Sequence, residues 1–404
     1  MSSPSRPELF HSSPFNFDPR VTAHERIRLP LTITDVTLRE GQQAAEVAFS
    51  AEDEVEFAKA LADAGVPVIQ AGYAGADDGT VKRIRDAVPG LRIAVLLVGW
   101  KDDASEAIKS SRAAGADVCS VLFRSADAHL SNLGHTRDSA IERVRELVAK
   151  GRQAGFRDVV FGPSFSTLAD FDFLMRLYSE ALDAGATVIS LADSMGTAKP
   201  AAVAFLVENM RRLAGDAAGV RVHMHNDFGL GVANTLAGIE AGANWVEVTV
   251  NGLGERAGNC PLEELVVALE ALYGVRVGIR TEALFDVCKL VERLTGAEIP
   301  PMKPVAGADV FSNKLEIHVK AAASNPTLME PFDPAAVGNR RTIRLGRGTG
   351  STGVRMKLAE LGVDLPPELV ESAVQRVNEK ALASKRGVSD EDFRQLVGEL
   401  TGVP

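Results

Sequence analysis

The pentapeptide HMHND, which begins at His223, places two histidines at alternate positions. If this segment is a β-strand, residues i and i+2 point to the same side, so His223 and His225 present both imidazoles to one point. Neutral imidazole is the commonest protein ligand of transition metals, and a carboxylate is a natural third donor. Two histidines on a buried strand can equally be hydrogen-bonded core residues, so the spacing alone leaves both interpretations open.

A second group of chemically capable residues occurs in TDVTLREGQQ, residues 34–43, which contains Asp35, Arg39 and Glu40. An arginine flanked by acids is usually a solvated ion pair that contributes little to stability. Its meaning therefore depends on the elements that position it.

Those elements repeat along the chain. Ala-Gly recurs just ahead of short β-branched runs, in DAGVPVIQAG, AAGADVCSVLF, QAGFRDVVFG, DAGATVISLAD, AAGVRVHMHN and EAGANWVEVTV. A glycine that follows a helix fits a C-terminal cap, and a continuous apolar run fits a buried parallel strand. With LTITDV and LRIAVLLVG, eight strands alternate with helices over roughly 250 residues, which predicts a (β/α)8 TIM barrel. A doubly wound open sheet is the alternative, but no G-x-G-x-x-G follows the first strand.

In such a barrel the catalytic groups lie where strands end and βα loops begin. The polar residues expected at this rim are Asp35, Arg39, Glu40, Gln70, Ser164, Asp193, Ser194, His223, His225 and Asn251. With Glu40 across the mouth from the two histidines, a metal site is favoured over a histidine pair in the core. Two imidazoles and one carboxylate leave coordination positions open, as a catalytic metal requires.

Bulk properties exclude several classes of function. The 404-residue chain has a formal charge of -10 and no evident basic patch, which argues against nucleic acid as a partner. Its three cysteines show no C-x-x-C spacing, so we expect a reducing compartment. The N-terminus has no apolar h-region and no apolar run is long enough to span a membrane, so we expect a cytoplasmic protein.

Composition also predicts the domain organisation. We expect a flexible N-terminal arm over residues 1–28 and the barrel over 29–298. The Pro/Gly-rich segment IPPMKPVAG then opens a linker and a first helical subdomain over 299–360, which carries His318. A second helical subdomain is expected over 361–404.

The motifs DVTLREGQQ, ADSMG, HMHNDFGLGVANTLAGIEAGANWVEVTVNGLGERAGN and the segment around His318 resemble the DRE-TIM metallolyase family. Within it they are similar to the branch of homocitrate and 2-isopropylmalate synthases. The resemblance implies a TIM barrel followed by small helical subdomains, often exchanged across a homodimer. It also implies a Claisen-type condensation in which a divalent metal (Zn, Mg or Mn) holds a 2-oxo acid and acetyl-CoA is the co-substrate.

The resemblance assigns roles residue by residue. It makes Glu40, His223 and His225 the metal ligands and Asn259 a weaker fourth ligand. It makes Arg39 the group that stabilises the developing alkoxide, held in place by Asp35, and His318 the acid–base group. Gln43 and Ser194 would contact the oxo acid. Homocitrate synthases bind the distal carboxylate of their acceptor after the fourth strand, and the resemblance makes Arg124, His129 and Arg137 of this stretch candidate contacts for a second anionic group, although an exposed loop arginine is as often solvated.

The chain also departs from the family pattern. Gln70 and Ser164 stand where relatives carry acids, Met329 where homocitrate synthases carry Tyr, and Asn313 and Gly348 where relatives carry His. These departures favour a changed acceptor. They also keep open a carbon–carbon lyase or aldolase on the same metal site. A non-catalytic relative is a third alternative, against which the retained Glu40, His223 and His225 argue.

Overall fold

The structure is a computed structural model that describes residues 6–402. The chain divides into two compact units. The first contains Pro14–Ile299, and the second contains Arg6–Ser13 together with the chain from Pro300 onward. The first unit ends at Ile299, one residue beyond the end of the barrel that we expected at residue 298.

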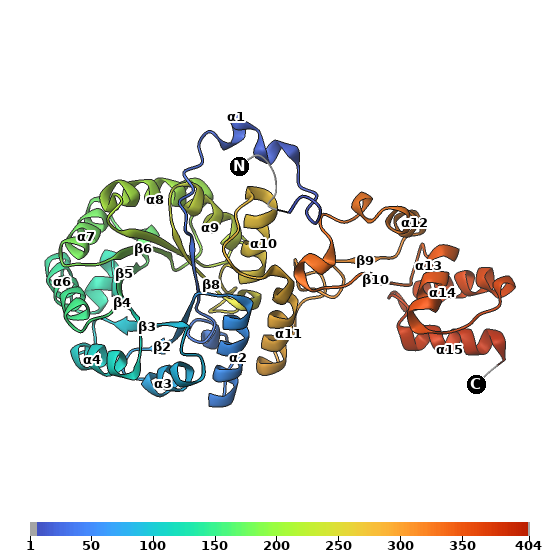
Figure 1. The fold of residues 1–404 in the computed structure, drawn as a ribbon, viewed down its shortest axis with the longest axis horizontal. Helices are drawn as coiled ribbons and strands as arrows, with labels where there is room; N and C mark the ends of the chain where they lie inside the picture. The colour runs from blue at the N-terminus through green and yellow to red at the C-terminus, as the bar shows by residue number, and fades with distance from the viewer. Residues whose placement is uncertain (1–5, 403–404) are drawn as a thin grey trace. The chain divides into compact units, whose positions relative to one another are not determined.

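The first unit is a closed parallel barrel in which each strand pairs with the next and β8 pairs with β1 (Figure 1). Its strands are β1 (Thr32–Asp35), β2 (Val68–Tyr73), β3 (Arg92–Val98), β4 (Val118–Arg124), β5 (Asp158–Ser164), β6 (Val188–Asp193), β7 (Gly219–Met224) and β8 (Trp245–Val248). The predicted TIM barrel is confirmed, and the open sheet is excluded because β1 and β8 share four paired positions.

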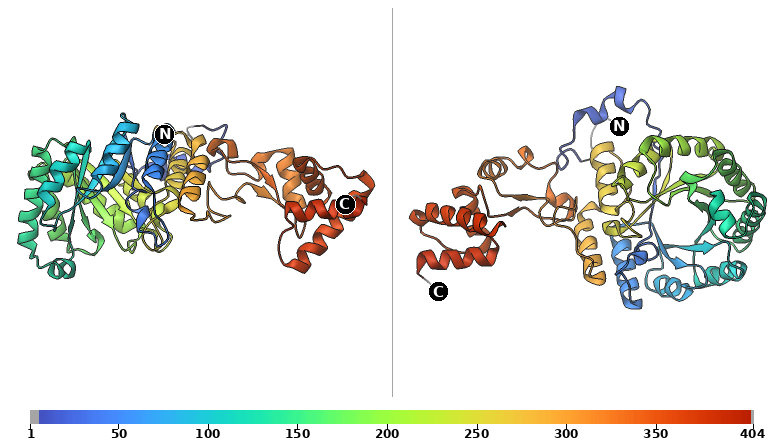
Figure 2. Two further views of the ribbon diagram at one scale, coloured as in Figure 1. Left: turned by 90° about the horizontal axis from the view of Figure 1, so that it is seen from below. Right: turned by 180° about the vertical axis from the view of Figure 1, so that it is seen from behind.

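Helices surround the strands, as the view from behind in Figure 2 shows. Those that follow the eight strands are α2 (Ala51–Ala64), α3 (Asp78–Ala87), α4 (Ala104–Ala114), α6 (Arg137–Gln153), α7 (Phe171–Asp183), α8 (Pro200–Ala214), α9 (Gly231–Glu240) and α10 (Leu262–Tyr273). The unit also contains α1 (Pro19–Thr22), α5 (Asp127–Asn132), α11 (Leu284–Thr295) and the short 3-10 turns η1 (Pro14–Phe17), η2 (Gly41–Gln43), η3 (Ser166–Leu168), η4 (Val250–Gly252) and η5 (Thr281–Ala283).

The repeat has the local cause expected from the sequence. Helix α2 begins at a capping box between Ser50 and Asp53 and ends at Gly65, whose φ of 90° places it in the left-handed region. Gly115 ends α4 in the same way, with a φ of 109°. Residues other than glycine rarely adopt this backbone conformation, so the Ala-Gly dipeptides mark helix ends.

The barrel interior is built in layers from alternate residues of each strand. The lower layer is apolar and contains Val68, Ala94, Val118, Val160, Val188 and Trp245. Two residues further along these strands the layer becomes polar, with Gln70, Ser120, Ser190 and Glu247, and Arg221 of β7 belongs to it. The apolar layer therefore supports a polar floor under the mouth of the barrel.

The second unit contains an apolar core to which several of its elements contribute. It contains β9 (Ser312–Asn313), β10 (Thr342–Ile343), α12 (Glu316–Ser324), α13 (Ser351–Leu361), α14 (Val370–Ser384), α15 (Asp390–Thr401), η6 (Pro326–Leu328), η7 (Pro334–Val337) and η8 (Pro367–Leu369). Val319 and Val354 share this core with Val377 and Phe393. The two helical subdomains that we expected on either side of residue 360 therefore pack as one body.

The N-terminal segment also differs from the flexible arm that we expected. Residues 1–5 lie outside the described part of the chain. Phe10 is buried in the second unit, where its ring lies 5.8 Å from that of Phe332, and Asp18 caps α1. An aromatic ring that buries apolar area holds such a segment in place. Among the described residues, no helix is both long and apolar enough to cross a bilayer.

Candidate active site

A cavity of about 370 Å³ lies at the mouth of the barrel, where the strands end. Its walls come from alternate, inward-facing residues of the strands and from the loops that follow them. They include Arg39, Glu40, Gln43, Tyr73, Leu96, Val98, Leu122, Arg124, Gly162, Ser164, Ser190, Ser194, Arg221, His223, His225, Glu247 and Arg256. Most of the residues expected at the rim therefore face one cavity.

Three buried side chains converge in this cavity as a potential metal site. One ligand atom each from Glu40, His223 and His225 lies within 4.8 Å of the others. The Nε2 atoms of the histidines are 3.3 Å apart, and the carboxylate oxygens of Glu40 lie 3.9 Å from His223 Nε2 and 3.7 Å from His225 Nε2. The predicted ligand set is thus assembled from β7 and from the loop after β1.

Asn259 reaches the same place through a loop that requires glycines. Residues 251–259 turn back so that Asn259 forms an antiparallel bridge with His225. Gly258 has a φ of 79°, and a Cβ there would lie 1.8 Å from the carbonyl oxygen of Gly252. A Cβ at Gly254 would lie 2.1 Å from Asn259 Oδ1. The glycines therefore allow the loop to bring Asn259 next to the two histidines.

The donor set fits a divalent cation. Asn259 Oδ1 is buried and makes no hydrogen bond with the described residues. Its Nδ2 lies 3.3 Å from His223 Nε2, so rotation of the amide would turn the oxygen toward the histidines. A buried polar atom without a partner is costly. Two imidazoles, a carboxylate and this amide oxygen match the ligands that Zn²⁺ and Mn²⁺ accept.

The electrostatics keep both imidazoles neutral. Burial lowers the pKa of His223, against the opposing effect of Glu247. Burial and the neighbouring His223 lower the pKa of His225 to about 3. Neutral imidazole is the form that binds a metal, so the site is ready for a cation without first losing protons.

Arg39 is held by a residue other than the one we expected. We expected Asp35 to hold it, but the carboxylate of Asp35 accepts hydrogen bonds from the backbone N and Oγ1 of Thr37, both at 2.9 Å. The Nε of Arg39 instead donates to Gln70 Oε1 at 2.6 Å, and its Nη1 contacts Glu40. The prediction for Asp35 is therefore wrong.

Strand alternation explains this correction. Thr34 points into the barrel, where its Oγ1 accepts a hydrogen bond from Trp245 Nε1 at 2.6 Å, so Asp35 points outward. Burial raises the pKa of Asp35 to about 7, against the hydrogen bonds from Thr37. Gln70, which we noted as a departure from the family, is the actual anchor of Arg39.

The predicted substrate contacts divide into two groups. Gln43 and Ser194 line the cavity. The Nε2 of Gln43 donates to the Tyr73 hydroxyl at 3.3 Å, and Arg256 donates to the Ser194 carbonyl at 2.7 Å. His129 is absent from the described cavity wall because its ring is stacked behind Phe165, with centroids 3.8 Å apart. A direct contact of His129 with substrate is therefore not supported.

Of the candidate anion contacts, Arg124 is the one on the cavity wall. Its guanidinium lies over the rings of Trp100 and Phe165, at 4.6 Å and 5.0 Å from their centroids. Its Nη1 donates to Ser164 Oγ at 3.4 Å, and it forms no ion pair with the described acids. Arg137, by contrast, is neutralised by two aspartates on the surface.

Sequence reasoning missed two charged residues of the floor. Arg221 and Glu247 are 4% and 3% exposed and lie 2.6 Å apart through Arg221 Nη1 and Glu247 Oε1. Burial opposes ionisation of Glu247, but Arg221 and then His223 outweigh it and lower its pKa to about 2. The signal was present, because Arg221 precedes His223 by two positions on one strand and must share its face.

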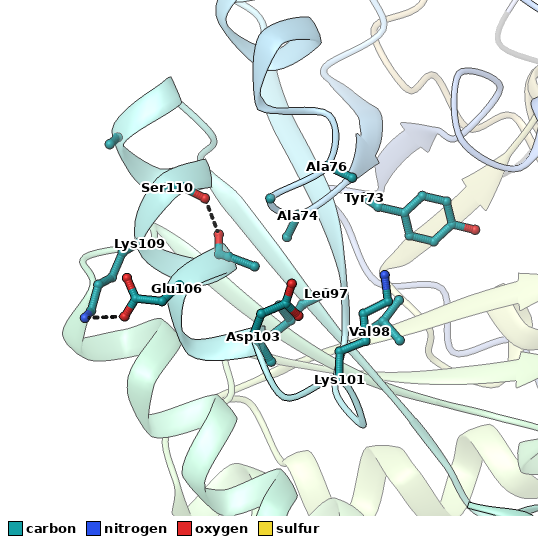
Figure 3. Close-up of a pocket in the computed structure, with 14 residues that line it drawn as sticks. Tyr73, Ala74, Ala76, Leu97, Val98, Lys101, Asp103, Glu106, Lys109 and Ser110 are labelled. Carbon is teal, nitrogen blue, oxygen red and sulfur yellow. Dashed lines mark hydrogen bonds and ion pairs between the residues drawn. The ribbon is translucent and has the colours of Figure 1, made fainter.

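A second hollow, of about 610 Å³, lies beside the mouth between the ends of β2 and β3 and helix α4. It shares Tyr73 and Val98 with the central cavity. Figure 3 shows Lys109 and Glu106 paired along α4, with Tyr73 on the side away from them. Mouth and hollow together offer more space than one small acid fills.

The second unit carries the remaining predicted residue. His318 lies on α12 and is half-buried. Its role in acid–base chemistry stays a prediction.

Comparison with known proteins identifies the relatives of both units. The HMGL-like family model matches residues 30–291. The chain belongs to the HMGL-like family. A second model, described as homocitrate synthase post-HMGL domain-like, matches residues 305–386. The resemblance to the synthase branch is thereby confirmed.

Relatives of this HMGL-like chain cover nearly its whole length. It is 38% identical to a probable 2-isopropylmalate synthase of Ignicoccus hospitalis, over 93% of this chain and 94% of that one. It is 36% identical to a homocitrate synthase of Methanopyrus kandleri, over 90% and 91% of the two chains. It is 35% identical to a 2-isopropylmalate synthase of Sulfolobus acidocaldarius, over 88% and 92%.

Solved structures share the fold. A hydroxymethylglutaryl-CoA lyase of Pseudomonas aeruginosa gives a TM-score of 0.59 at 20% identity, over 68% of this chain and 95% of that one. The carboxyl transferase domain of Rhizobium etli pyruvate carboxylase gives 0.54 at 18% identity, over 77% and 54%. At these identities the likeness shows a shared fold and nothing further.

Proposed function

We propose that the protein condenses acetyl-CoA with a 2-oxo acid, that water then hydrolyses the CoA thioester to give a 2-alkylmalate or homocitrate-like product and CoA, and that the reaction depends on a divalent metal. The observation that carries this proposal is the convergence of Glu40, His223 and His225 beside Arg39 in the barrel mouth. The relatives named as 2-isopropylmalate and homocitrate synthases support the same reaction class.

Glu40, His223 and His225 would hold the cation, with Asn259 as the fourth protein ligand. A bound divalent cation supplies Lewis-acid polarisation of a ketone and positions the neighbouring carboxylate. Glu40 and Arg39 place a carboxylate and a guanidinium side by side on one wall of the cavity.

Arg39 supplies the electrostatic part of catalysis. Its Nε is fixed by Gln70 and its Nη1 by Glu40, and among the described residues its Nη2 makes no hydrogen bond. A guanidinium that is held before the reaction stabilises the negative charge that develops on the ketone oxygen without reorganising. Gln43 and Ser194, on the same cavity wall, would hold the acid in place.

The cavity favours an acceptor with a second anionic group. Arg124 is a partly buried cation on the wall, and it has no acidic partner among the described residues. Leu96, Val98 and Leu122 supply an apolar wall for the carbon chain that joins the two acid groups. We place the pantetheine arm of acetyl-CoA in the hollow beyond Tyr73, which adjoins this cavity.

His318 is our proposed acid–base group for deprotonation of the acetyl methyl. The position at which relatives carry an acid after the fifth strand is Ser164, whose hydroxyl donates to the Phe123 carbonyl at 3.1 Å. A serine there cannot accept the proton, so the base must come from elsewhere. Homodimer formation, which the resemblance implies, also belongs to the proposal.

The test is CoA thiol release from acetyl-CoA by protein loaded with Zn²⁺, Mg²⁺ or Mn²⁺, with a panel of monocarboxylic and dicarboxylic 2-oxo acids. We expect turnover that requires metal and is greatest with a dicarboxylic acceptor. Arg124→Met should raise the KM for that acceptor at least tenfold and leave monocarboxylic acids unaffected, since one charge-assisted contact is worth about 1.5–3 kcal/mol.

Two outcomes would overturn the proposal. Absence of thiol release with every acceptor in metal-loaded protein would exclude the condensation. Release of a 2-oxo acid from a hydroxy diacid, or of acetyl-CoA from the CoA thioester of such an acid, without free thiol, would instead identify a lyase on the same site.

A further inference from the structure

Arg221 crosses the interior of the barrel beneath the metal site. It starts on β7, and its Nε donates to Ser190 Oγ on β6 at 2.9 Å. Its Nη1 donates to Ser120 Oγ on β4 at 3.1 Å and lies 2.6 Å from Glu247 Oε1 on β8. One guanidinium therefore ties together four strands of the closed barrel.

Gly162 on β5 makes this crossing possible. A Cβ at position 162 would lie 3.2 Å from the Cβ of Ser190 and 3.4 Å from Arg221 Nη2. Any larger side chain would point into the space that the guanidinium fills on its way from β7 to β4.

Glu247 connects this cation to a predicted metal ligand. Its second oxygen, Oε2, lies 3.0 Å from His223 Nδ1. His223 and Glu247 are paired positions of β7 and β8, so the contact is fixed by the barrel register. In the tautomer that carries its proton on Nδ1, the N–H of His223 faces this carboxylate. The lone pair on Nε2 then faces Glu40 and His225.

Resting on the proposed metal site, we infer that Arg221 is a positioning residue that fixes the tautomer and orientation of His223 through Glu247. Arg221 holds one oxygen of the carboxylate, so the other can only face the imidazole. A partner carboxylate on the distal nitrogen orients a ligating histidine and raises its basicity. His225 differs, because among the described residues its carboxylate contact is made through Nε2, which lies 3.7 Å from Glu40.

The test compares three variants that change this chain of contacts. Glu247→Gln keeps the shape of the side chain, but its amide both donates and accepts hydrogen bonds, so either tautomer of His223 can bond to it. Arg221→Met removes the guanidinium and keeps an apolar stem. The double variant leaves no unpaired buried charge, so it tests the inference if a single variant does not fold.

A control variant breaks another arginine–carboxylate pair of the same barrel, which is more exposed than the pair of Arg221 and Glu247. Arg92 and Asp158 form an ion pair between the starts of β3 and β5, on the far side of the apolar layer. Asp158→Asn should lower thermal stability without changing either readout of the metal site.

The first readout is the metal dissociation constant, measured by competition with a chromophoric chelator. We expect Glu247→Gln and the double variant to weaken binding roughly 10–100-fold and Arg221→Met about tenfold, in the range found for such outer partners. Unchanged dissociation constants in folded variants would overturn the inference.

The second readout is the histidine tautomer in metal-free protein, from long-range ¹H–¹⁵N correlation with ¹⁵N-histidine. The chain has seven histidines, and loss of a signal in His223→Gln assigns the ring of interest. We expect the Nδ1–H tautomer in the wild type and a mixture in Glu247→Gln. This readout separates the two proposals: a wild type that binds no metal would overturn the proposed function, whereas a wild type without the Nδ1–H form would overturn only the role of Arg221.

Discussion

Replacement of Arg39 by lysine tests the central electrostatic claim, because it keeps the charge and removes the geometry. Arg39 uses Nε for Gln70 and Nη1 for Glu40. A lysine ammonium on its flexible stem has no planar fork, so it cannot keep both contacts and still point at a substrate oxygen.

The magnitude follows from the contacts that are lost. Removal of one preorganised donor to a developing oxyanion lowers kcat by about 100- to 1000-fold, which corresponds to roughly 2.7–4 kcal/mol. Gln70 is fully buried and would lose the donor to its Oε1, which costs about 1–3 kcal/mol of stability. We therefore expect a large fall in kcat and a moderate fall in melting temperature.

The assay is CoA thiol release under saturating metal and acceptor, together with the metal dissociation constant. The dissociation constant should change little, because Glu40, His223 and His225 remain. Gln70→Leu is the matched control: it keeps the guanidinium but removes its anchor, so kcat should fall less than in Arg39→Lys. An Arg39→Lys enzyme that keeps more than a tenth of the wild-type kcat would refute the reasoning.

Three further predictions concern the loop, the second unit and the base. Gly258→Ala should weaken metal binding by at least tenfold in chelator competition, because its Cβ would collide with the Gly252 carbonyl, and unchanged binding would show that the loop can shift. Burial opposes ionisation of Glu316, but hydrogen bonds to its carboxylate, first those from Thr352, outweigh burial and lower its pKa from 4.5 to about 2. The ionised carboxylate therefore stabilises the fold above pH 4.5, and this stabilisation disappears as the pH falls to 2. Urea unfolding should show Glu316→Gln to be roughly 2 kcal/mol less stable than the wild type at pH 7, with the gap closing near pH 2, and a gap independent of pH would contradict this. His318→Gln should lower kcat at least 100-fold in the thiol-release assay while metal binding is unchanged, and near-normal turnover would remove it as the base.

Much of the candidate site could be read from residue spacing. The alternation of His223 and His225 on one strand, and the position of Glu40 after the first strand, predicted a carboxylate facing two imidazoles. Both features depend on local geometry, which a strand period of two and the order of a barrel already fix.

The choice of partners could not be read in this way. Arg39 is followed directly by Glu40 and lies four residues beyond Asp35, yet its Nε bonds to Gln70 of the next strand. His129 lies behind Phe165 instead of in the cavity. Each outcome depends on which face of its element a side chain occupies and on what the neighbouring strand places opposite.

The sequence by itself determined the eight-stranded barrel and the convergence of Glu40, His223 and His225, because helix caps, buried runs and strand alternation are local properties of the chain. Its motifs also determined the family. Only the tertiary structure decided that Gln70 anchors Arg39 and that Arg221 reaches Glu247 beneath the proposed metal site. These contacts join residues from different strands, and they exist only because barrel closure and register bring particular positions into one layer.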